Sequence, residues 1–190
     1  MDSNRSDIFE KLHSGELYDP CDSRIAAVQT ECLELLYRYN ATTPLEADKR
    51  RELLQKMFAE IGEGCYIEPP LHANWGGKFV KFGKHVYANF NLTLVDDTEI
   101  TVGDNTKFGP GVIIATAGHP LASDLREQGC QFNRPVRIGN NCWLGAGAIV
   151  LPGVTVGDNS IIGAGAVVSR DVPPNSLALG VPAKVVKKLP

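Results

Sequence analysis

An apolar residue returns at every sixth position along the second half of the chain. This array consists of Ile138, Leu144, Val150, Val156, Ile162 and Val168, and glycine directly follows four of its members. An earlier array keeps the same spacing, with a two-residue slip at Asp96 and Asp97, and consists of Phe82, Ala88, Leu94, Val102, Phe108 and Ile114. Neither the period of a helix nor that of a strand gives this spacing. The pattern therefore predicts a repeated six-residue unit.

A unit of six residues has room for one short strand and one turn. Three such units close one triangular coil, in which the apolar residue points inward and the small residue after it relieves crowding at the corner. Stacked coils bond their backbones to one another, and their inward side chains merge into one aliphatic column. Turn-forming pairs such as Asp104–Asn105 and Asp158–Asn159 recur at the corners. The sequence thus predicts a mainly β protein built as a prism-shaped parallel solenoid.

The residues before the repeat have helical spacing instead. A helix over about 22–39 would collect on one stripe Ile25, Val28, Cys32, Leu35, Leu36 and Tyr39. A second helix is expected to begin at Pro44, with Thr43 as its cap and Glu46 reaching back to that cap. Gly62 is expected to end it.

This change of period divides the chain into two segments. We expect an N-terminal helical segment over residues 1–64 and a β-helix with a C-terminal tail over residues 65–190. The repeat fails between Ile114 and Ile138, where a polar, proline-bounded stretch predicts a protruding loop at about 118–135. Loops on rigid scaffolds often carry function.

Composition argues against several classes of protein. Nineteen basic residues against 22 acidic ones give a net charge of -3, which argues against a nucleic-acid surface. No apolar run approaches the roughly 20 residues that a membrane helix needs. The polar stretch Met1–Glu10 is unlike a secretory signal, and five scattered cysteines form no CxxC pair. We expect a cytoplasmic protein with free thiols, without a metal site and without a membrane or nucleic-acid partner.

One of the four histidines stands out by its position. His119 lies between Gly118 and Pro120, where the repeat becomes the loop, so its backbone is constrained while its ring stays at the surface. An imidazole, whose ordinary pKa is about 6.5, suits a general base near neutral pH. His13 is expected at the surface of a polar helical segment, whereas His72 and His85 are expected to be hydrogen-bonded structural residues.

Two charged groups are open to more than one interpretation. Asp96 and Asp97 could act as a carboxylate pair, although the slip in the repeat also explains them as turn formers. Positive charge near the end of the chain could meet phosphates or could belong to a solvated tail. It consists of Arg170, Lys184, Lys187 and Lys188.

Four stretches resemble the hexapeptide-repeat acetyltransferases, and specifically the maltose/galactoside O-acetyltransferase group. They are GELYDP at 15–20 with the helical residues after it, YANFNLTLVDD at 87–97, AGHP at 117–120, and the repeat at 138–186. The resemblance as a whole extends over nearly the whole chain. The resemblance implies a left-handed β-helix, acetyl-CoA as acetyl donor, a sugar hydroxyl as acceptor, and a homotrimer with active sites between subunits.

The resemblance also implies roles for individual residues. His119 matches the catalytic histidine, which takes the proton from the acceptor hydroxyl as its oxygen attacks the thioester directly. The acceptor would be held by Asn74, Asn89 and Asp97. The cofactor would be held by Asn89, by Trp143, Ala146 and Ala164 beside the pantetheine arm, and by Ser169, Arg170, Lys184 and Lys187 at the nucleotide end.

Two departures from the group leave other functions open. Gln29 stands where a basic residue is usual, and Cys130 replaces an acidic residue that could orient His119. One alternative is transfer to a non-sugar hydroxyl, such as that of an antibiotic or of serine. Another is a non-enzymatic trimeric scaffold. A zinc hydratase on the same fold would need three imidazoles, and Asp124 stands at the position where a third imidazole would join His85 and His119.

Overall fold

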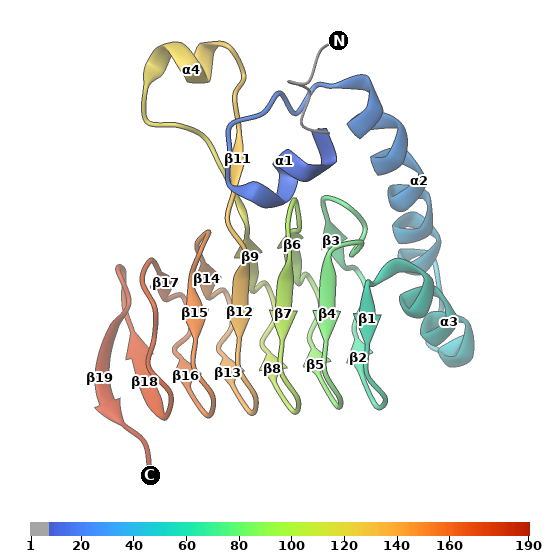
Figure 1. Ribbon diagram of the computed structural model, residues 1–190. Helices are drawn as coiled ribbons and strands as arrows, with labels where there is room; N and C mark the ends of the chain where they lie inside the picture. Colours follow the sequence, from blue (N-terminus) through green and yellow to red (C-terminus); the bar gives the residue numbers. More distant parts are fainter. Residues whose placement is uncertain (1–7) are drawn as a thin grey trace.

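Three parallel sheets form the three faces of a triangular column in the computed structural model, which describes residues 8–190 (Figure 1). The chain visits sheets 1, 2 and 3 in turn, so that three consecutive strands make one coil. Sheet 1 contains β1 (Glu60–Ile61), β4 (Val80–Phe82), β7 (Ile100–Val102), β12 (Val136–Ile138) and β15 (Thr155–Val156). Sheet 2 contains β2 (Tyr66–Ile67), β5 (Tyr87–Ala88), β8 (Lys107–Phe108), β13 (Trp143–Leu144), β16 (Ile161–Ile162), β18 (Ser176–Leu179) and the antiparallel β19 (Lys184–Lys188). Sheet 3 contains β3 (His72–Ala73), β6 (Thr93–Val95), β9 (Ile113–Ala115), β14 (Ile149–Val150) and β17 (Val167–Val168).

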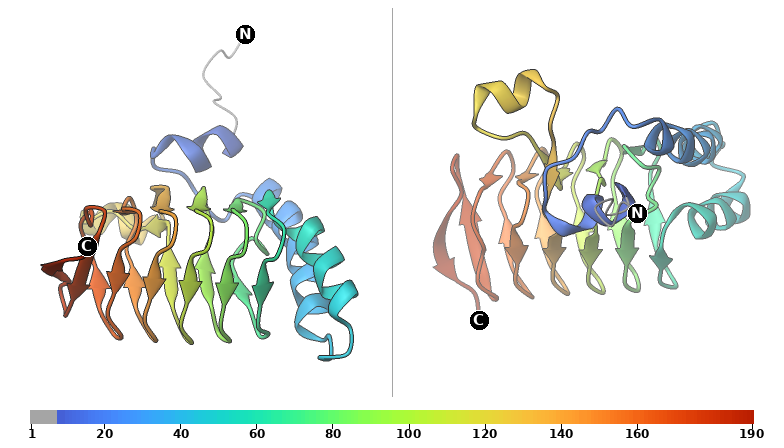
Figure 2. Two further views of the ribbon diagram at one scale, coloured as in Figure 1. Left: turned by 90° about the horizontal axis from the view of Figure 1, so that it is seen from below. Right: turned by 45° about the horizontal axis from the view of Figure 1, so that its top comes forward.

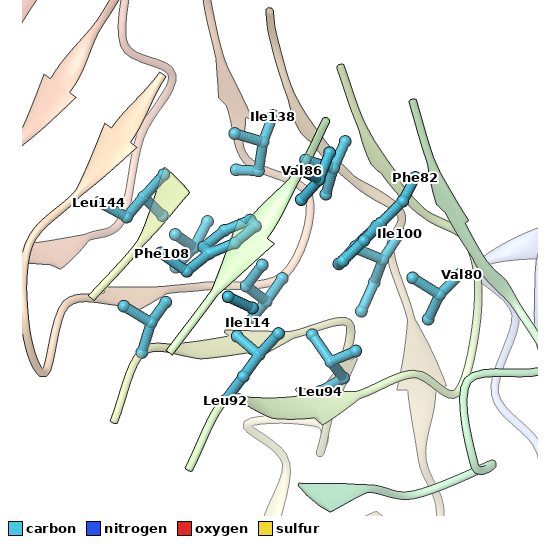
Figure 3. Close-up of a cluster of buried hydrophobic side chains, with 14 of the residues drawn as sticks. Val80, Phe82, Val86, Leu92, Leu94, Ile100, Phe108, Ile114, Ile138 and Leu144 are labelled. Atoms are coloured by element: carbon cyan, nitrogen blue, oxygen red, sulfur yellow. The ribbon is translucent and has the colours of Figure 1, made fainter. Parts of the chain in front are cut away.

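Coils of 18 residues, or three hexads, stack in register along the second array. The paired residues are Ile138 with Val156, Leu144 with Ile162, and Val150 with Val168. All twelve apolar residues of the two arrays are at most 3% exposed, and Figure 3 shows several of them meeting in the interior of the column. The predicted parallel β-helix is therefore confirmed. The six-residue period of the sequence is the spacing of the side chains that point into the column.

Glycine after the inward residue allows two coils to approach closely at a corner. A Cβ atom on Gly139 would lie 2.6 Å from the backbone nitrogen of Asp158, and one on Gly145 would lie 2.6 Å from that of Ala164. Real Cβ atoms are essentially never found this close to other atoms. Glycine is therefore required at these corners for the coils to stack, as the sequence predicts.

The described residues 8–190 contain four helices beside the column. They are α1 (Ile8–Ser14), α2 (Ser23–Asn40), α3 (Ala47–Met57) and α4 (Ser123–Glu127). Within this part of the chain, no helix is long and apolar enough to cross a membrane. Residues 1–7, which make up most of the stretch that argues against a secretory signal, lie outside the described residues.

The start of α3 differs from the sequence prediction. α2 agrees with the predicted range of 22–39, but α3 begins at Ala47 rather than at Pro44. The Glu46 carboxylate does reach back and accepts the Thr43 N–H at 2.7 Å. The Glu46 N–H, however, donates to the Thr43 carbonyl at 3.1 Å. These contacts close a turn, and the helix starts only after it.

The column begins one coil earlier than the visible repeat. β1, β2 and β3 pair with β4, β5 and β6, and the partners lie 21 residues apart, as Glu60 and Lys81 do. This spacing is not a multiple of six, because turns at 74–79 lengthen the connection between β3 and β4. The expected end of the second helix at Gly62 is therefore wrong: α3 ends at Met57, and Ile61 lies in β1.

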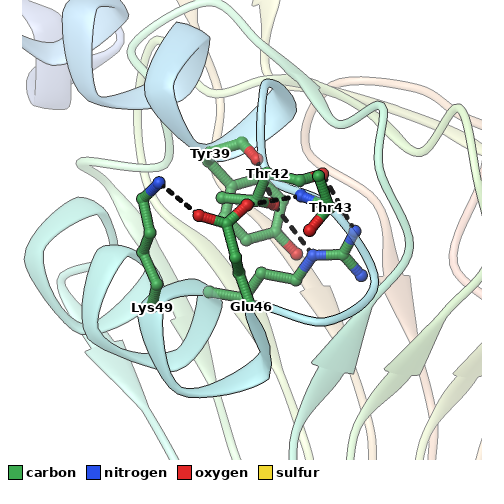
Figure 4. Close-up of polar contacts among 6 residues, drawn as sticks. Tyr39, Thr42, Thr43, Glu46 and Lys49 are labelled. Carbon is green, nitrogen blue, oxygen red and sulfur yellow. Dashed lines mark hydrogen bonds and ion pairs between the residues drawn. The ribbon is translucent and has the colours of Figure 1, made fainter.

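A buried arginine closes the junction between α2 and α3 (Figure 4). Arg50 donates from Nε to the Thr42 hydroxyl at 2.8 Å and from Nη2 to the Thr42 carbonyl at 3.2 Å. Its Nη1 donates to the Tyr66 hydroxyl at 3.1 Å, and the Tyr39 hydroxyl donates to the Ile67 carbonyl. The guanidinium thus ties the helical junction to β2.

We expect the substitution Arg50→Met to lower the free energy of unfolding by about 2 to 3 kcal/mol, because it leaves buried acceptors on Thr42 without donors. Arg51→Met is the matched control, since the Arg51 side chain is 68% exposed and pairs only with exposed Asp48. Such surface pairs contribute little. Urea unfolding of both variants measures the difference, and equal midpoints would contradict the role of Arg50.

The predicted protruding loop leaves the corner between sheets 3 and 1 (Figures 1 and 2). Its base is an antiparallel pair of β10 (Ala117–Gly118) and β11 (Phe132–Asn133), and α4 lies at its tip. α1 contacts β11 beside the column. The N-terminal segment also reaches the loop, because Tyr18 forms an antiparallel bridge with Gln131.

Candidate active site

His119 directly follows β10 at the base of the loop, and its side chain is exposed. Its Nδ1 atom lies 2.9 Å from the carbonyl oxygen of Cys130. A carbonyl only accepts hydrogen bonds, so Nδ1 must carry the proton. In the neutral ring the lone pair is then at Nε2. The geometry prepares this imidazole to accept a proton at Nε2.

The contact between His119 and the Cys130 carbonyl shows what orients the imidazole although position 130 has no acidic side chain. Loss of an acidic side chain at this position removes a carboxylate that could orient His119. In the structure the backbone carbonyl of the same residue orients the ring instead. A backbone group does not depend on the side chain at position 130, so the replacement by cysteine leaves the orientation of His119 intact.

Asp97 and Asn74 meet at the corner between sheets 3 and 1, the corner from which the loop with His119 departs. Asp97 is 5% exposed, and its two oxygens accept from Asn74 Nδ2 at 3.0 and 2.9 Å. Its Oδ1 also accepts from Gln131 Nε2 at 3.2 Å. Gln29, which stands where the group usually has a basic residue, donates from Nε2 to the Asn74 carbonyl at 2.9 Å. The structure therefore brings together two of the three residues predicted to hold the acceptor.

Asp96 has a different environment from its neighbour Asp97. Its side chain is fully buried and accepts the backbone N–H groups of Trp75 at 2.7 Å and Gly77 at 2.9 Å. These contacts fix the turns between β3 and β4, next to Asn74. Burial raises the pKa of Asp96 to about 7, although the two N–H donors favour the ionised form.

The raised pKa of Asp96 predicts a pH-dependent stability. Between about pH 4 and pH 7 the folded state binds a proton that the unfolded state, with an ordinary pKa of 3.8, has released. The free energy of unfolding therefore falls as pH rises through this window, by an amount on the order of 3 kcal/mol. We expect Asp96→Asn to lack this component, and exposed Asp124→Asn to keep it. Denaturant unfolding at several pH values tests this, and parallel curves for wild type and Asp96→Asn would contradict it.

Three of the predicted cofactor residues lie at the corner between sheets 2 and 3. Ala146 and Ala164 are exposed and stack one coil apart, with the N–H of Gly165 donating to the Ala146 carbonyl at 2.9 Å. Asn89 lies at the same corner, where its N–H donates to the Phe108 carbonyl at 3.0 Å. Three glycines at this corner have positive φ and open space around a notional Cβ: Gly111, Gly147 and Gly165. The corner therefore presents a smooth strip of backbone.

The remaining candidates are exposed but lie on different faces. Trp143 points out from β13 and is 54% exposed. Ser169 and Arg170 follow β17, whereas Lys184 and Lys187 lie on β19 at the end of sheet 2. Within one chain, sheet 3 separates the corner of His119 from the corner of Ala146. On one chain the candidate residues therefore form separate groups, one at each of these corners.

The three other histidines make local contacts. His13 Nδ1 lies 2.8 Å from the Thr98 hydroxyl, and burial lowers its pKa. His72 Nε2 lies 3.3 Å from Asn91 Oδ1, and His85 occupies a turn with a φ of 55°. Within residues 8–190, no group of three or more His, Cys, Asp or Glu side chains is placed to hold a metal ion.

Sequence analysis missed a buried polar cluster beside His119. Tyr18, Gln131 and Asn133 are each at most 9% exposed and hydrogen-bond one another. Gln131 and Asn133 alternate along a short stretch before Pro135, which is the spacing of one face of a strand. That alternation was the only signal available, and it does not reveal that Tyr18 is the partner.

Comparison with known proteins places this geometry in a family. The model of the maltose acetyltransferase hexapeptide capping motif matches residues 11–62, and that of the bacterial transferase hexapeptide (six repeats) matches residues 135–170. The galactoside O-acetyltransferase of Lactococcus lactis is 52% identical over 181 residues, which are 95% of this chain and 87% of that protein. The chain belongs to the maltose/galactoside O-acetyltransferase group.

Solved structures of this group match the whole fold. The maltose O-acetyltransferase of Clostridium difficile 630 has a TM-score of 0.95 and 36% identity, with 98% of this chain and 100% of that chain covered. A galactoside acetyltransferase in complex with coenzyme A has a TM-score of 0.94 and 39% identity, with 98% and 92% covered. The resemblance found in the sequence is confirmed, and so is the assignment to an O-acetyltransferase family.

Proposed function

We propose that this protein transfers the acetyl group of acetyl-CoA to a hydroxyl of a maltose-, glucose- or galactoside-like sugar. The observation that carries the proposal is His119, an exposed imidazole whose Nδ1–H donates to the Cys130 carbonyl, so that in the neutral ring the lone pair is on Nε2. The relatives named as galactoside and maltose O-acetyltransferases support the sugar as acceptor, and the neighbour with bound coenzyme A supports the donor.

The chemistry needs one base and no covalent enzyme intermediate. His119 Nε2 takes the proton of the acceptor hydroxyl while the oxygen attacks the carbonyl carbon of the thioester. Polar donors stabilise the negative charge on the tetrahedral oxygen. When the intermediate collapses, the C–S bond breaks, and coenzyme A leaves with the proton that His119 received. The products are an acetyl ester and a free thiol.

The acceptor would be held by Asp97 and Asn74 beside this base, with Asn89 at the opposite side of the site. Among residues 8–190, Asp97 Oδ1 accepts hydrogen bonds from Asn74, Gln131 and Trp75, whereas Oδ2 accepts only from Asn74. Oδ2 therefore retains the capacity to accept from a sugar hydroxyl. Exposed Asn74 offers its amide oxygen to a second hydroxyl. Holding both substrates in register supplies much of the rate enhancement.

Acetyl-CoA would lie along the corner between sheets 2 and 3. The smooth backbone at Ala146 and Ala164 admits the pantetheine arm, and exposed Trp143 covers its side. Positive charge for the phosphates and hydrogen-bonding groups for the nucleotide end come from Ser169, Arg170, Lys184 and Lys187.

The candidate residues of one chain lie at two corners that sheet 3 separates, and this separation explains why we propose a homotrimer. A site that needs both corners forms when the Ala146 corner of one subunit faces the His119 corner of the next, and a head-to-tail contact of this kind can close into a ring. On the outward side of sheet 3, between the two corners, the last three strands carry an apolar, half-buried row of Ile113, Ile149 and Val167, which continues the row of His72 and Thr93.

All five cysteines are free thiols, which supports a reducing cytoplasm as the compartment.

Thiol release from acetyl-CoA in the presence of a panel of acceptors tests the proposal. The panel contains maltose, glucose, galactosides, serine and an aminoglycoside antibiotic, and mass spectrometry identifies the acetyl ester. We expect release that depends on a sugar. Release only with serine or the antibiotic would support the alternative acceptor instead. Calorimetry without any heat of coenzyme A binding would support a non-enzymatic scaffold.

A further inference from the structure

One peptide group links the N-terminal segment to His119. The peptide that joins Cys130 to Gln131 accepts at its carbonyl from His119 Nδ1, at 2.9 Å, and donates from its N–H to the Tyr18 carbonyl, at 3.0 Å. The Tyr18 N–H donates in return to the Gln131 carbonyl at 2.9 Å. The first of these backbone hydrogen bonds holds the peptide that orients the imidazole, and the second holds the next peptide, which joins Gln131 to Phe132.

The Gln131 side chain ties the same peptide to the acceptor side of the site. Gln131 is 9% exposed, and its Nε2 donates to Asp97 Oδ1 at 3.2 Å, to Asn133 Oδ1 at 3.2 Å and to the Tyr18 hydroxyl. Burial raises the pKa of the Tyr18 hydroxyl to about 12, so it stays protonated and donates to Asn133 Oδ1 at 3.3 Å. A buried network with all its members satisfied is rigid.

Asn133 anchors this network to the column and to α1. Its Nδ2 donates to the Leu12 carbonyl at 3.1 Å and to the Asp97 carbonyl at 3.2 Å. The Tyr18 ring, 4% exposed, packs in a cluster with Ile8, Leu12, Ile25 and Trp75. Packing on one side and the solenoid corner on the other therefore leave the Cys130–Gln131 peptide little freedom to rotate.

We propose that Tyr18 and Gln131 are positioning residues for acetyl transfer. They hold the Cys130–Gln131 peptide so that its carbonyl keeps His119 in the Nδ1–H tautomer, and they join this peptide to Asp97. The distance and orientation between the His119 ring and the Asp97 carboxylate, which is proposed to hold the acceptor, then stay fixed. This inference rests on the proposed function for its catalytic meaning, but the tautomer of His119 can be measured without any activity.

Two variants test the network, with one matched control. Gln131→Met keeps the length of the side chain and removes its donors. Tyr18→Phe keeps the packed ring and removes only the hydroxyl. Gln128→Met changes the same residue type in the same loop, where the side chain is exposed. If Gln131→Met fails to fold, Tyr18→Phe still decides the question.

Nitrogen-15 NMR of the histidine side chains reads the tautomer directly, with His119→Gln used to assign the signals. At a pH where the ring is neutral, we expect wild type and Gln128→Met to show protonated Nδ1 and unprotonated Nε2. Gln131→Met and Tyr18→Phe should show a mixture of both tautomers. A pure Nδ1–H tautomer in both variants would overturn the proposal, whether or not the protein proves to be an acetyltransferase.

Kinetics then connect the tautomer to turnover. We expect Gln131→Met to lower kcat about tenfold, the scale on which groups that orient a functional imidazole act, and to leave KM for acetyl-CoA within about twofold of wild type. The apparent pKa in the kcat/KM profile should shift in this variant and stay unchanged in Gln128→Met. Unchanged kcat, or a loss without any shift of the pH profile, would assign Gln131 a purely structural role and overturn the proposal.

Discussion

The substitution His119→Ala should lower kcat for acetyl transfer by roughly 100- to 10,000-fold, the usual contribution of a positioned general base. KM for acetyl-CoA should change little, because the residues proposed to hold the cofactor, among them Ala146 and Ala164, do not include His119. Steady-state thiol release at saturating sugar measures kcat, and the KM for each substrate is obtained separately.

His85→Asn provides the matched histidine control. His85 occupies a turn with a φ of 55°, a conformation that asparagine tolerates well, so this change removes an imidazole with little strain. We expect it to leave kcat unchanged. Near-complete activity in His119→Ala, or an equal loss in both variants, would contradict the role of His119 as the base.

Gly145→Ala should lower the free energy of unfolding by about 3 kcal/mol or more, because overpacking at a fixed backbone is destabilising. The new Cβ would lie 2.6 Å from the backbone nitrogen of Ala164. That nitrogen belongs to the next coil, which hydrogen bonds hold on both sides of the contact. The neighbouring coil therefore cannot withdraw without breaking its register.

Gly147→Ala is the control within the same turn. Gly147 has a φ of +67° but no atom within 4 Å of a notional Cβ, so alanine there meets backbone strain alone, at about 1 kcal/mol. Denaturant unfolding of the two variants compares a steric clash with a conformational penalty. Equal losses would contradict the claim that close approach of the coils determines the glycine positions.

The repeat was predictable from the sequence because its cause is local. Each inward residue must be apolar, and glycine follows it where two coils approach closely, so Ile138, Gly139 and their equivalents show the period directly. The first coil was not predictable in the same way, since its partners lie 21 residues apart and the hexads lose phase. The predicted start of α3 at Pro44 was wrong because Thr43 and Glu46 form their mutual hydrogen bonds in a turn as well as they would in a helix cap.

The site was predictable only in part, for a physical reason. His119 is marked by its neighbours Gly118 and Pro120, whereas the slip in the repeat explains Asp97 as a turn former and only the resemblance gives it a role in holding the acceptor. The group that orients His119 is a backbone carbonyl, and every residue has one, so no residue type signals it. The bridge between Tyr18 and Gln131 joins positions more than a hundred residues apart, which no local pattern reveals.

The measurement that most directly tests the shared site is complementation between two inactive variants. His119→Ala damages one corner, and Ala146→Phe would block the other corner, at an exposed position where the larger side chain costs little stability. Each variant alone should be inactive. When equal amounts are unfolded and refolded together, a site between two subunits has both corners intact in about one case in four, if trimers assemble at random. The account predicts about a quarter of wild-type acetyl transfer from this mixture, and a mixture as inactive as either parent would contradict it.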